Sequence, residues 1–326
     1  MRIAVIIPAY RVTEQILGVL ARLGPEVAGV FVVDDCCPEG SGALVQAQCR
    51  DPRVQVLTHA QNQGVGGATL TGFAAASAAG FDILVKLDGD GQMDPALIPR
   101  LVRPLLAERA DFAKGNRFYA LESLTAMPAV RLFGNSALSF VNKLVSGYWP
   151  IMDPTNGFVA IHASVFRLLP VAKLARRYFF ESDLLFRLST VRAVVADVPM
   201  DAVYAGEVSS LRISQVLWDF PPKYASRLVK RVFYSYFLRD FNACSLYLLA
   251  GAAMMGFGGV FGVREWMRSI ETGVAATSGT VLLAALPVIL GFQSLLAAVS
   301  FDVANVPSQP LCRDLRHIET APGAVS

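Results

Sequence analysis

The sequence predicts a doubly wound α/β domain followed by a pair of membrane-spanning helices. Residues 1 to about 210 alternate short β-branched runs with helical stretches, and two long runs near the end of the chain carry no charge. Composition agrees, because 54% of the 326 residues are hydrophobic and 17% are charged, against about 25% charged in ordinary soluble domains. The net charge of +3 gives no sign of a nucleic-acid partner.

Local sequence patterns place the elements of the α/β domain. Short β-branched runs predict strands at 3–7, 30–33, 54–57, 83–87 and 193–198. Length and apolar spacing predict helices at 13–23, 66–79 and 95–108. Because ligands of such sheets bind beyond the carboxyl ends of the strands, the functional site is expected there.

Two uncharged runs predict a membrane hairpin. They cover 23 residues at 241–263 and 29 residues at 273–301, and each exceeds the length of about 20 residues that crosses a bilayer core. Buried core helices are the alternative, but such helices rarely run so long without charge. Basic residues before the first run, together with Arg313 and Arg316 after the second, predict that the α/β domain and both termini are cytoplasmic. The expected location is therefore the cytoplasmic (inner) membrane, with a multi-pass topology.

The segment before the first run mixes aromatic and basic side chains. Lys223, Arg227, Lys230 and Arg231 alternate with tyrosines and phenylalanines, which predicts an interfacial helix whose alternative is an ordinary solvated helix. The expected organisation is a domain at 1–212, interfacial helices at 213–240, membrane helices at 241–263 and 273–301, and a tail at 302–326. Gly258 and Gly262 have G-x-x-x-G spacing, which serves packing inside the hairpin or a homo-oligomer.

Cysteine usage and the start of the chain indicate a reducing compartment. The 5 cysteines show no C-x-x-C spacing, which argues against a disulfide framework and a structural zinc site. The first apolar run is broken by Pro8 and lacks a cleavage site, so no signal peptide is expected.

Polar residues follow three of the expected strands and meet at one edge of the sheet. Pro8-Ala9-Tyr10 follows the first strand, Asp34-Asp35 the second, and Asp88-Gly89-Asp90-Gly91-Gln92 the fourth. Asp88, Asp90 and Gln92 offer hard oxygen ligands in a tight turn, which suits Mg²⁺ or Mn²⁺; an ordinary surface Asp-Gly turn is the alternative. The glycine-rich loop from Asn62 to Ala68 leads into a helix and serves either anion binding or helix capping.

Six motifs together carry a family resemblance that covers residues 1 to about 215. They are Ile7-Pro8-Ala9-Tyr10, Val32 to Ser41, Asn62 to Ala68, Asp88 to Gln92, Lys114-Gly115-Asn116-Arg117 and Asp153-Pro154-Thr155-Asn156-Gly157-Phe158. In this order they resemble a family 2 glycosyltransferase of the GT-A fold, in the branch of dolichyl-phosphate mannose synthases and bacterial polyprenyl-phosphate glycosyltransferases. Cys36-Cys37 departs from the family's usual Asn-Ser, and the Q-x-x-R-W signature of processive synthases is absent from the sequence.

The resemblance implies a GT-A type mixed sheet and a metal-dependent, inverting transfer of one sugar. The donor would be a GDP- or UDP-sugar, the acceptor undecaprenyl or dolichyl phosphate, and the cofactor Mg²⁺ or Mn²⁺. Alternatives are another lipid acceptor or a catalytically silent membrane scaffold that binds nucleotide sugar. Because a lipid phosphate is ionised at cytosolic pH, no general base is required, and His59, His162 and His317 are expected to be structural or solvent-exposed.

The site residues follow from the same resemblance and from the chemistry of each group. The expected catalytic residues are Asp90, Arg117 and Arg131. The expected nucleotide-sugar contacts are Pro8, Ala9, Tyr10, Glu14, Asp35, Asn62, Gly66, Asp88, Gly89 and Asp153. The expected acceptor-phosphate contacts are Lys114, Arg117, Arg131 and Arg212, and the expected metal ligands are Asp88, Asp90 and Gln92. Glu181 and Asp183 orient hydroxyls or cap a helix.

Overall fold

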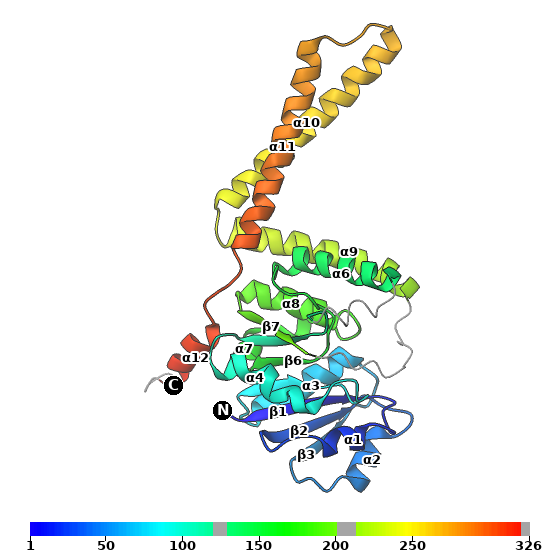
Figure 1. Cartoon of the computed structure of the whole chain (residues 1–326), viewed down its shortest axis with the longest axis vertical. Coiled ribbons are helices and arrows are strands. Elements are labelled where there is room, and N and C mark those ends of the chain that lie inside the picture. Colours follow the sequence, from blue (N-terminus) through cyan, green and yellow to red (C-terminus); the bar gives the residue numbers. More distant parts are fainter. Residues whose placement is uncertain (120–128, 201–212, 321–326) are drawn as a thin grey trace. The chain divides into compact units, whose positions relative to one another are not determined.

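A computed structural model describes residues 1–119, 129–200 and 213–320 of the chain. It divides into two units, which we name the sheet unit, Met1–Leu228 with the chain from Pro307 onward, and the hairpin unit, Val229–Val306. Figure 1 shows the elements of both units.

A mixed sheet forms the centre of the sheet unit. Within the described residues its strands are β1 Ile3–Ala9, β2 Val27–Asp34, β3 Val54–Thr58, β4 Ile83–Lys86, β5 Phe112–Asn116, β6 Val159–His162 and β7 Val195–Pro199. Their spatial order is β3-β2-β1-β4-β6-β5-β7, and β6 runs antiparallel to both of its neighbours while the other pairs are parallel. The predicted mixed α/β fold is confirmed. The sequence did not reveal β5, whose second half is Lys114-Gly115-Asn116, or the four-residue β6.

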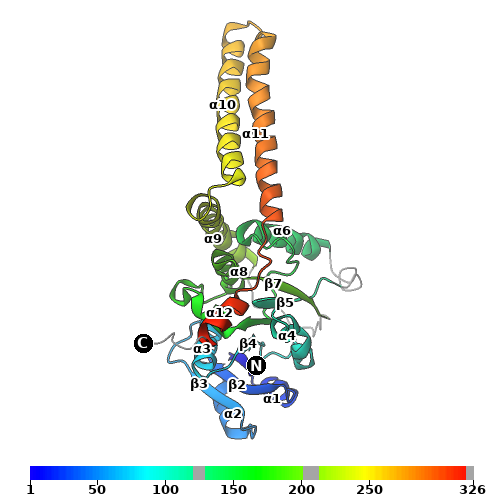
Figure 2. The same cartoon turned by 90° about the vertical axis from the view of Figure 1, so that its left-hand side faces the viewer.

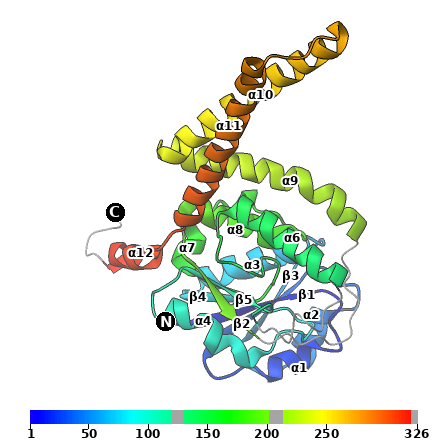
Figure 3. The same ribbon diagram turned by 45° about the horizontal axis from the view of Figure 1, so that its top comes forward.

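Helices cover both faces of this sheet, as Figure 3 shows. Among the residues that the structure describes, the α-helices that begin in the sheet unit are α1 Ile16–Ala21, α2 Ser41–Gln48, α3 Val65–Ala78, α4 Ile98–Leu106, α6 Ala129–Ser146, α7 Ala163–Leu168, α8 Phe180–Val191, α9 Ile213–Phe233 and α12 Leu311–Thr320. Helix α3 packs on the face that carries Ile6, where a side chain at Gly72 would overlap a methyl group of Ile6. Val5 and Ile7 point to the opposite face and join the core formed with α1 and α4. Apolar burial on both faces therefore holds β1 in the middle of the unit.

The C-terminal helix α12 docks on the sheet unit (Figure 2). Asp111, a buried residue just before β5, accepts hydrogen bonds from the backbone N–H groups of Leu311 at 3.0 Å, Cys312 at 2.8 Å and Val194 at 2.8 Å. The carboxylate therefore caps the first turn of α12 and ties it to the start of β7. The chain returns to the sheet unit after passing through the hairpin unit.

Loss of the Asp111 charge is expected to release α12. Hydrogen bonds to a charged group contribute about 1.5–3 kcal/mol each, so Asp111→Asn weakens three of them at once. We expect alkylation of the buried Cys312 thiol to become about tenfold faster, measured by mass spectrometry of the labelled peptides. Asp314→Asn, which makes the same change at an exposed position of α12, should leave the rate unaltered. Equal protection of Cys312 in both variants would contradict the capping role of Asp111.

The hairpin unit contains two long apolar helices, α10 Ala243–Thr272 and α11 Ser278–Ala304. Both are long and apolar enough to cross a membrane, and only 11% of the most apolar window of each is buried inside the protein. They run antiparallel (Figure 1), and a side chain at Gly258 would lie 2.7 Å from the carbonyl oxygen of Ala284. The G-x-x-x-G spacing therefore serves close packing inside the hairpin.

Arg231 and Asp302 form a buried ion pair in the hairpin unit. The Arg231 guanidinium binds the Asp302 carboxylate with both nitrogens of its fork, at 2.7 Å and 3.0 Å, and the Tyr236 hydroxyl donates to the same carboxylate. Tyr236 belongs to a π-helical turn, Tyr234–Leu238, that precedes α10. This cluster joins the segment before the hairpin to the end of α11.

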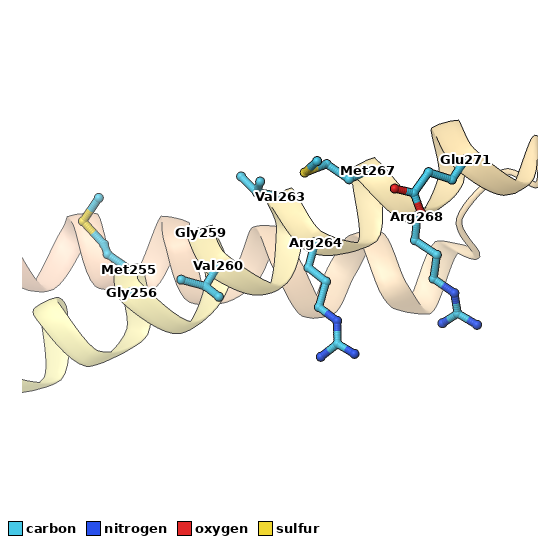
Figure 4. A pocket seen from close by; sticks show the side chains of 9 residues that line it. All are labelled: Met255, Gly256, Gly259, Val260, Val263, Arg264, Met267, Arg268 and Glu271. Carbon is cyan, nitrogen blue, oxygen red and sulfur yellow. The ribbon is translucent and has the colours of Figure 1, made fainter.

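A shallow hollow of about 910 Å³ lies along one face of α10 (Figure 4). Met255, Val260 and Val263 line its apolar part, and the charged side chains of Arg264, Arg268 and Glu271 lie toward the end of the helix. Such a stripe, apolar with charged side chains at one end, is typical of a helix that meets lipid and places its charges at the membrane surface.

Candidate active site

The Asp88-to-Gln92 turn follows β4 at the carboxyl edge of the parallel strands. Leu87 extends the ladder with a 3.0 Å hydrogen bond from its N–H to the carbonyl of Ile6, and Gly91 adopts a φ of +77°. A side chain at Gly89 would come within 3.2 Å of Ile7, so glycine lets the turn pack against β1. The N–H of Gln92 donates to Asp90 Oδ1 at 3.1 Å, which closes the turn. The sheet thus places Asp88 and Asp90 at the edge where ligands of α/β sheets bind.

The side-chain oxygens of this turn suit a hard divalent cation. Asp88 is 28% exposed and Asp90 is partly exposed, so both carboxylates reach the surface of the site. Within 1–119, 129–200 and 213–320, no cluster of three or more His, Cys, Asp and Glu side chains has metal-binding geometry. Two carboxylates and the Gln92 amide leave further coordination positions for oxygens of a diphosphate, an arrangement typical of Mg²⁺ and Mn²⁺.

A buried lysine stands behind the turn, and none of the sequence motifs included it. Lys86 is the last residue of β4 and its side chain is 1% exposed. Its Nζ lies 2.8 Å from Asp88 Oδ1, 3.5 Å from Glu181 Oε1 and 3.3 Å from the carbonyl oxygen of Gly157. The available signal was a single lysine within the apolar run Ile83 to Leu87, directly before the first aspartate.

The Asp153-to-Phe158 loop lies beside the turn, and three basic side chains hold this loop. Lys86 donates to the carbonyl of Gly157, Lys114 donates to the carbonyl of Asn156, and Arg117 binds Asp153 through Nε at 2.7 Å and Nη2 at 3.1 Å. Lys86 and Lys114 are both register partners of Val159 on β6, so they flank it on one face of the sheet. Burial lowers the pKa of the Lys114 ammonium to about 8.

Asp35 is buried, and its carboxylate holds the glycine-rich loop. Its oxygens accept hydrogen bonds from the backbone N–H groups of Gln63 at 2.8 Å and Gly64 at 2.7 Å, and His59 Nδ1 lies 2.7 Å from the same carboxylate. The backbone carbonyl of Asp35 also accepts from Asn62 Nδ2 at 3.1 Å. His59 is thus a buried, hydrogen-bonded histidine, and Asp35 stays a predicted nucleotide contact whose side chain already organises the loop.

The remaining predicted donor contacts lie around this edge. Tyr10 is exposed after β1, Pro8 and Ala9 continue that strand, and Glu14 is exposed in the following turn. Gly66 is buried, and a side chain there would lie 2.7 Å from Phe180, so its role in the structure is close packing against α8.

Cys37 fits the loop after β2. The N–H of Arg11 donates to Cys37 Sγ at 3.1 Å, and Sγ lies 3.2 Å from the Ser41 hydroxyl. Partial burial opposes ionisation of the Cys37 thiol, but these hydrogen bonds together outweigh it and lower the pKa. The thiol thus occupies a hydrogen-bonding position, although the sequence departs from the family pattern there.

The structure does not describe the side chains of two predicted phosphate contacts. Arg212 lies outside the described residues. Arg131 belongs to α6, but its side chain is not among those described. Both stay predictions, whereas Lys114, Arg117 and Asp153 lie together.

A hollow of about 320 Å³ lies next to Arg117. Phe118, Phe140, Lys143 and Met152 line it together with small polar side chains of α6. It combines apolar walls with one lysine, which suits a ligand that has both an apolar and an anionic part.

Asp197 on β7 gives a pH-dependent test of this region. Burial raises the pKa of its carboxyl from 3.8 to about 6, although Asn116 Nδ2 donates to it at 2.7 Å. Because the folded state binds the proton more tightly than the unfolded state, this group adds stability as the pH falls through about 6. We expect Asp197→Asn to raise Tm by about 2–4 °C at neutral pH, and this gain should shrink as the pH falls through about 6 and disappear only below the unfolded-state pKa of 3.8. Thermal unfolding across this range checks it, and a constant difference between the two proteins would contradict it.

Comparison with known sequences identifies the same region. The model of the family described as "Glycosyl transferase family 2" matches residues 4–169. An undecaprenyl-phosphate mannosyltransferase from Micrococcus luteus is 31% identical over 62% of this chain and 84% of its own length. A UDP-N-acetylglucosamine–dolichyl-phosphate N-acetylglucosaminyltransferase from Methanococcus voltae is 28% identical over 70% of this chain and 96% of its own length.

Solved structures share the fold. Glucosyl-3-phosphoglycerate synthase from Mycobacterium tuberculosis, in a complex with Mn²⁺, UDP and glucosyl-3-phosphoglycerate, superimposes with a TM-score of 0.53 and 20% identity, over 71% of this chain and 79% of that one. The mixed sheet, the aspartate turn at its carboxyl edge and the family match over residues 4–169 all support the same family assignment. The chain is a glycosyltransferase and belongs to glycosyl transferase family 2.

Proposed function

We propose that this glycosyltransferase moves one sugar from a GDP- or UDP-sugar to a polyprenyl phosphate, with inversion and with Mg²⁺ or Mn²⁺ as cofactor. The observation that carries the proposal is the pair of partly exposed carboxylates, Asp88 and Asp90, which follow β4 and lie beside the Asp153-to-Phe158 loop. The names of the Micrococcus and Methanococcus relatives support the acceptor class.

In this proposal separate groups of residues bind the metal, the nucleotide and the acceptor phosphate. Asp88, Asp90 and Gln92 hold the cation, which supplies Lewis-acid stabilisation of the leaving diphosphate. The chain at the end of β1, from Pro8 to Tyr10, and the loop organised by Asp35 bind the nucleotide. Arg117 is 32% exposed and its guanidinium is fixed by the buried Asp153, so it is preorganised to bind phosphate oxygens of the acceptor.

A phosphate acceptor is favoured over a lipid hydroxyl by the state of two carboxylates on α8. A hydroxyl needs a general base. Glu181 is 3.5 Å from the Lys86 ammonium, and the buried Asp183 accepts from Arg227 Nε at 2.6 Å and from the N–H of Ala175 at 2.8 Å. Both are engaged within the protein, whereas an ionised lipid phosphate attacks without giving up a proton.

The proposed location is the cytoplasmic (inner) membrane. Two apolar helices are candidate spans, and the chain before and after them belongs to the same unit, which requires an even number of crossings. The basic residues that flank the hairpin place the sheet unit and the tail in the cytoplasm under the positive-inside rule. A reporter fused between α10 and α11 should therefore be labelled from the opposite membrane face to one at the C-terminus.

A direct assay tests the function. Purified protein in detergent is incubated with radiolabelled UDP- and GDP-sugars and polyprenyl phosphate, with Mn²⁺ or with chelator. We expect a sugar–phosphate lipid to form from one donor class with Mn²⁺ and not with chelator. Products from a hydroxyl lipid alone would point to the other acceptor class, and donor binding without release of nucleoside diphosphate would point to a silent scaffold.

A further inference from the structure

Lys86 is unusual among the charged residues near the site because it is buried against two acids. An ammonium group taken out of water is costly unless it is paired, and its partners are Asp88 Oδ1 at 2.8 Å and Glu181 Oε1 at 3.5 Å. Asp88 is itself a proposed metal ligand. The lysine therefore touches the proposed metal site from the protein side, while Asp88 remains partly open to solvent.

The surroundings of Lys86 leave space for this contact. A side chain at Gly157 would overlap Lys86 Nζ and would lie 2.8 Å from Asp88 Oδ2. Glycine at this position of the Asp153-to-Phe158 loop therefore admits both the ammonium and the carboxylate. The Gly157 carbonyl also accepts a hydrogen bond from Lys86, so the loop, β4 and α8 all fix the position of its charge.

We propose that Lys86 is a positioning residue that makes tight binding of the divalent cation depend on the donor. Its positive charge offsets part of the negative charge of Asp88, Asp90 and Glu181, so the two aspartates alone hold the cation weakly. The diphosphate of the nucleotide sugar then adds the negative charge that the site needs. This inference rests on the proposed function, and it predicts that the cation and the nucleotide bind cooperatively.

The test measures binding of Mn²⁺ alone to the full-length protein in detergent, by electron paramagnetic resonance, and repeats it with UDP and with GDP. Wild-type protein should bind Mn²⁺ weakly alone and more tightly with a nucleoside diphosphate. Lys86→Gln, whose amide still donates a hydrogen bond toward Gly157, should bind Mn²⁺ alone about tenfold more tightly than wild type. The additional gain from the nucleotide should shrink in this variant.

Two further variants separate charge from structure. Lys86→Gln combined with Glu181→Gln removes one charge of each sign, so its affinity for Mn²⁺ alone should return toward the wild-type value. Lys173→Gln makes the same substitution at an exposed lysine and should leave the affinity unchanged. Thermal unfolding shows whether each variant is folded. If the double variant Lys86→Gln with Glu181→Gln does not fold, Lys86→Met with Glu181→Gln takes its place.

The outcomes are distinct. An affinity of Lys86→Gln for Mn²⁺ alone that equals the wild-type value overturns the inference while leaving the proposed function intact. A double variant that binds Mn²⁺ as tightly as Lys86→Gln overturns the inference in the same way. Failure of the wild-type protein to bind Mn²⁺ with either nucleoside diphosphate overturns the metal assignment itself, and the inference with it.

Discussion

Asp90→Asn is expected to lower kcat by about a thousandfold while the protein remains folded. Asp90 is a proposed metal ligand in the turn after β4, and loss of a group that stabilises transition-state charge typically costs about 10²–10³ in rate. In the wild-type protein the N–H of Gln92 donates to Asp90 Oδ1 at 3.1 Å. The asparagine side chain still offers an oxygen to this N–H, so the turn should keep its shape. Turnover is measured as nucleoside diphosphate released per enzyme.

A nearby aspartate, just beyond this turn, offers a matched control. Asp94 lies four positions further along, and its Oδ1 accepts a 3.1 Å hydrogen bond from the N–H of Ala96. Asp94→Asn makes the same change in charge and shape outside the proposed ligand set, so its kcat should stay within about twofold of wild type. Similar losses in both variants, or full activity of Asp90→Asn at saturating Mn²⁺, would refute the role of Asp90.

Asp302→Ala is expected to have the largest effect on stability, a loss of about 3–5 kcal/mol. The change leaves the Arg231 guanidinium buried without the carboxylate that binds both nitrogens of its fork, and it removes the acceptor of the Tyr236 hydroxyl. Cys244 reports on the same region, because its buried thiol lies 3.6 Å from the carbonyl oxygen of Ala298. We expect a lower temperature of unfolding in detergent and faster alkylation of Cys244.

Removing both charges separates pairing from burial. Arg231→Met with Asp302→Leu leaves no unpaired charge and should recover most of the lost stability, since buried ion pairs are often replaced by apolar residues at little cost. Asp240→Ala removes an exposed aspartate whose carboxylate accepts a 2.9 Å hydrogen bond from Asn242 Nδ2, and should change little. An Asp302→Ala protein as stable as Asp240→Ala would show that the ion pair does not hold the hairpin unit together.

These two effects differ in how far the sequence revealed them. Asp90 stands in a short motif directly after an apolar strand, and local pattern was enough to identify it. The partnership of Arg231 with Asp302 joins positions 71 residues apart, and no local pattern connects them. The same holds for Asp111 and Cys312, which are 201 residues apart. Such long-range polar pairs depend on the tertiary fold, and the local patterns of a single sequence do not show which distant residues come into contact.

The sheet shows the same division. β1, β2 and β4 are predictable because buried parallel strands are nearly continuous apolar runs. β5 escapes prediction because Lys114 and Asn116 occupy it, and these polar residues are buried by contacts with Asn156 and Asp197 from other elements. Polar satisfaction by distant partners replaces apolar character at this strand.

The sequence by itself determined the alternation of strands and helices, the three polar strand ends, and the two uncharged runs, because each depends on residues close together in the chain. Only the tertiary structure decided that the Asp35 carboxylate binds the backbone of the glycine-rich loop and that Lys86 pairs with Asp88 and Glu181. It also decided that Asp111 caps α12. The physical reason is that a buried charge or carboxylate must find partners wherever the fold places them. Those partners come from strands, loops and helices far apart in sequence.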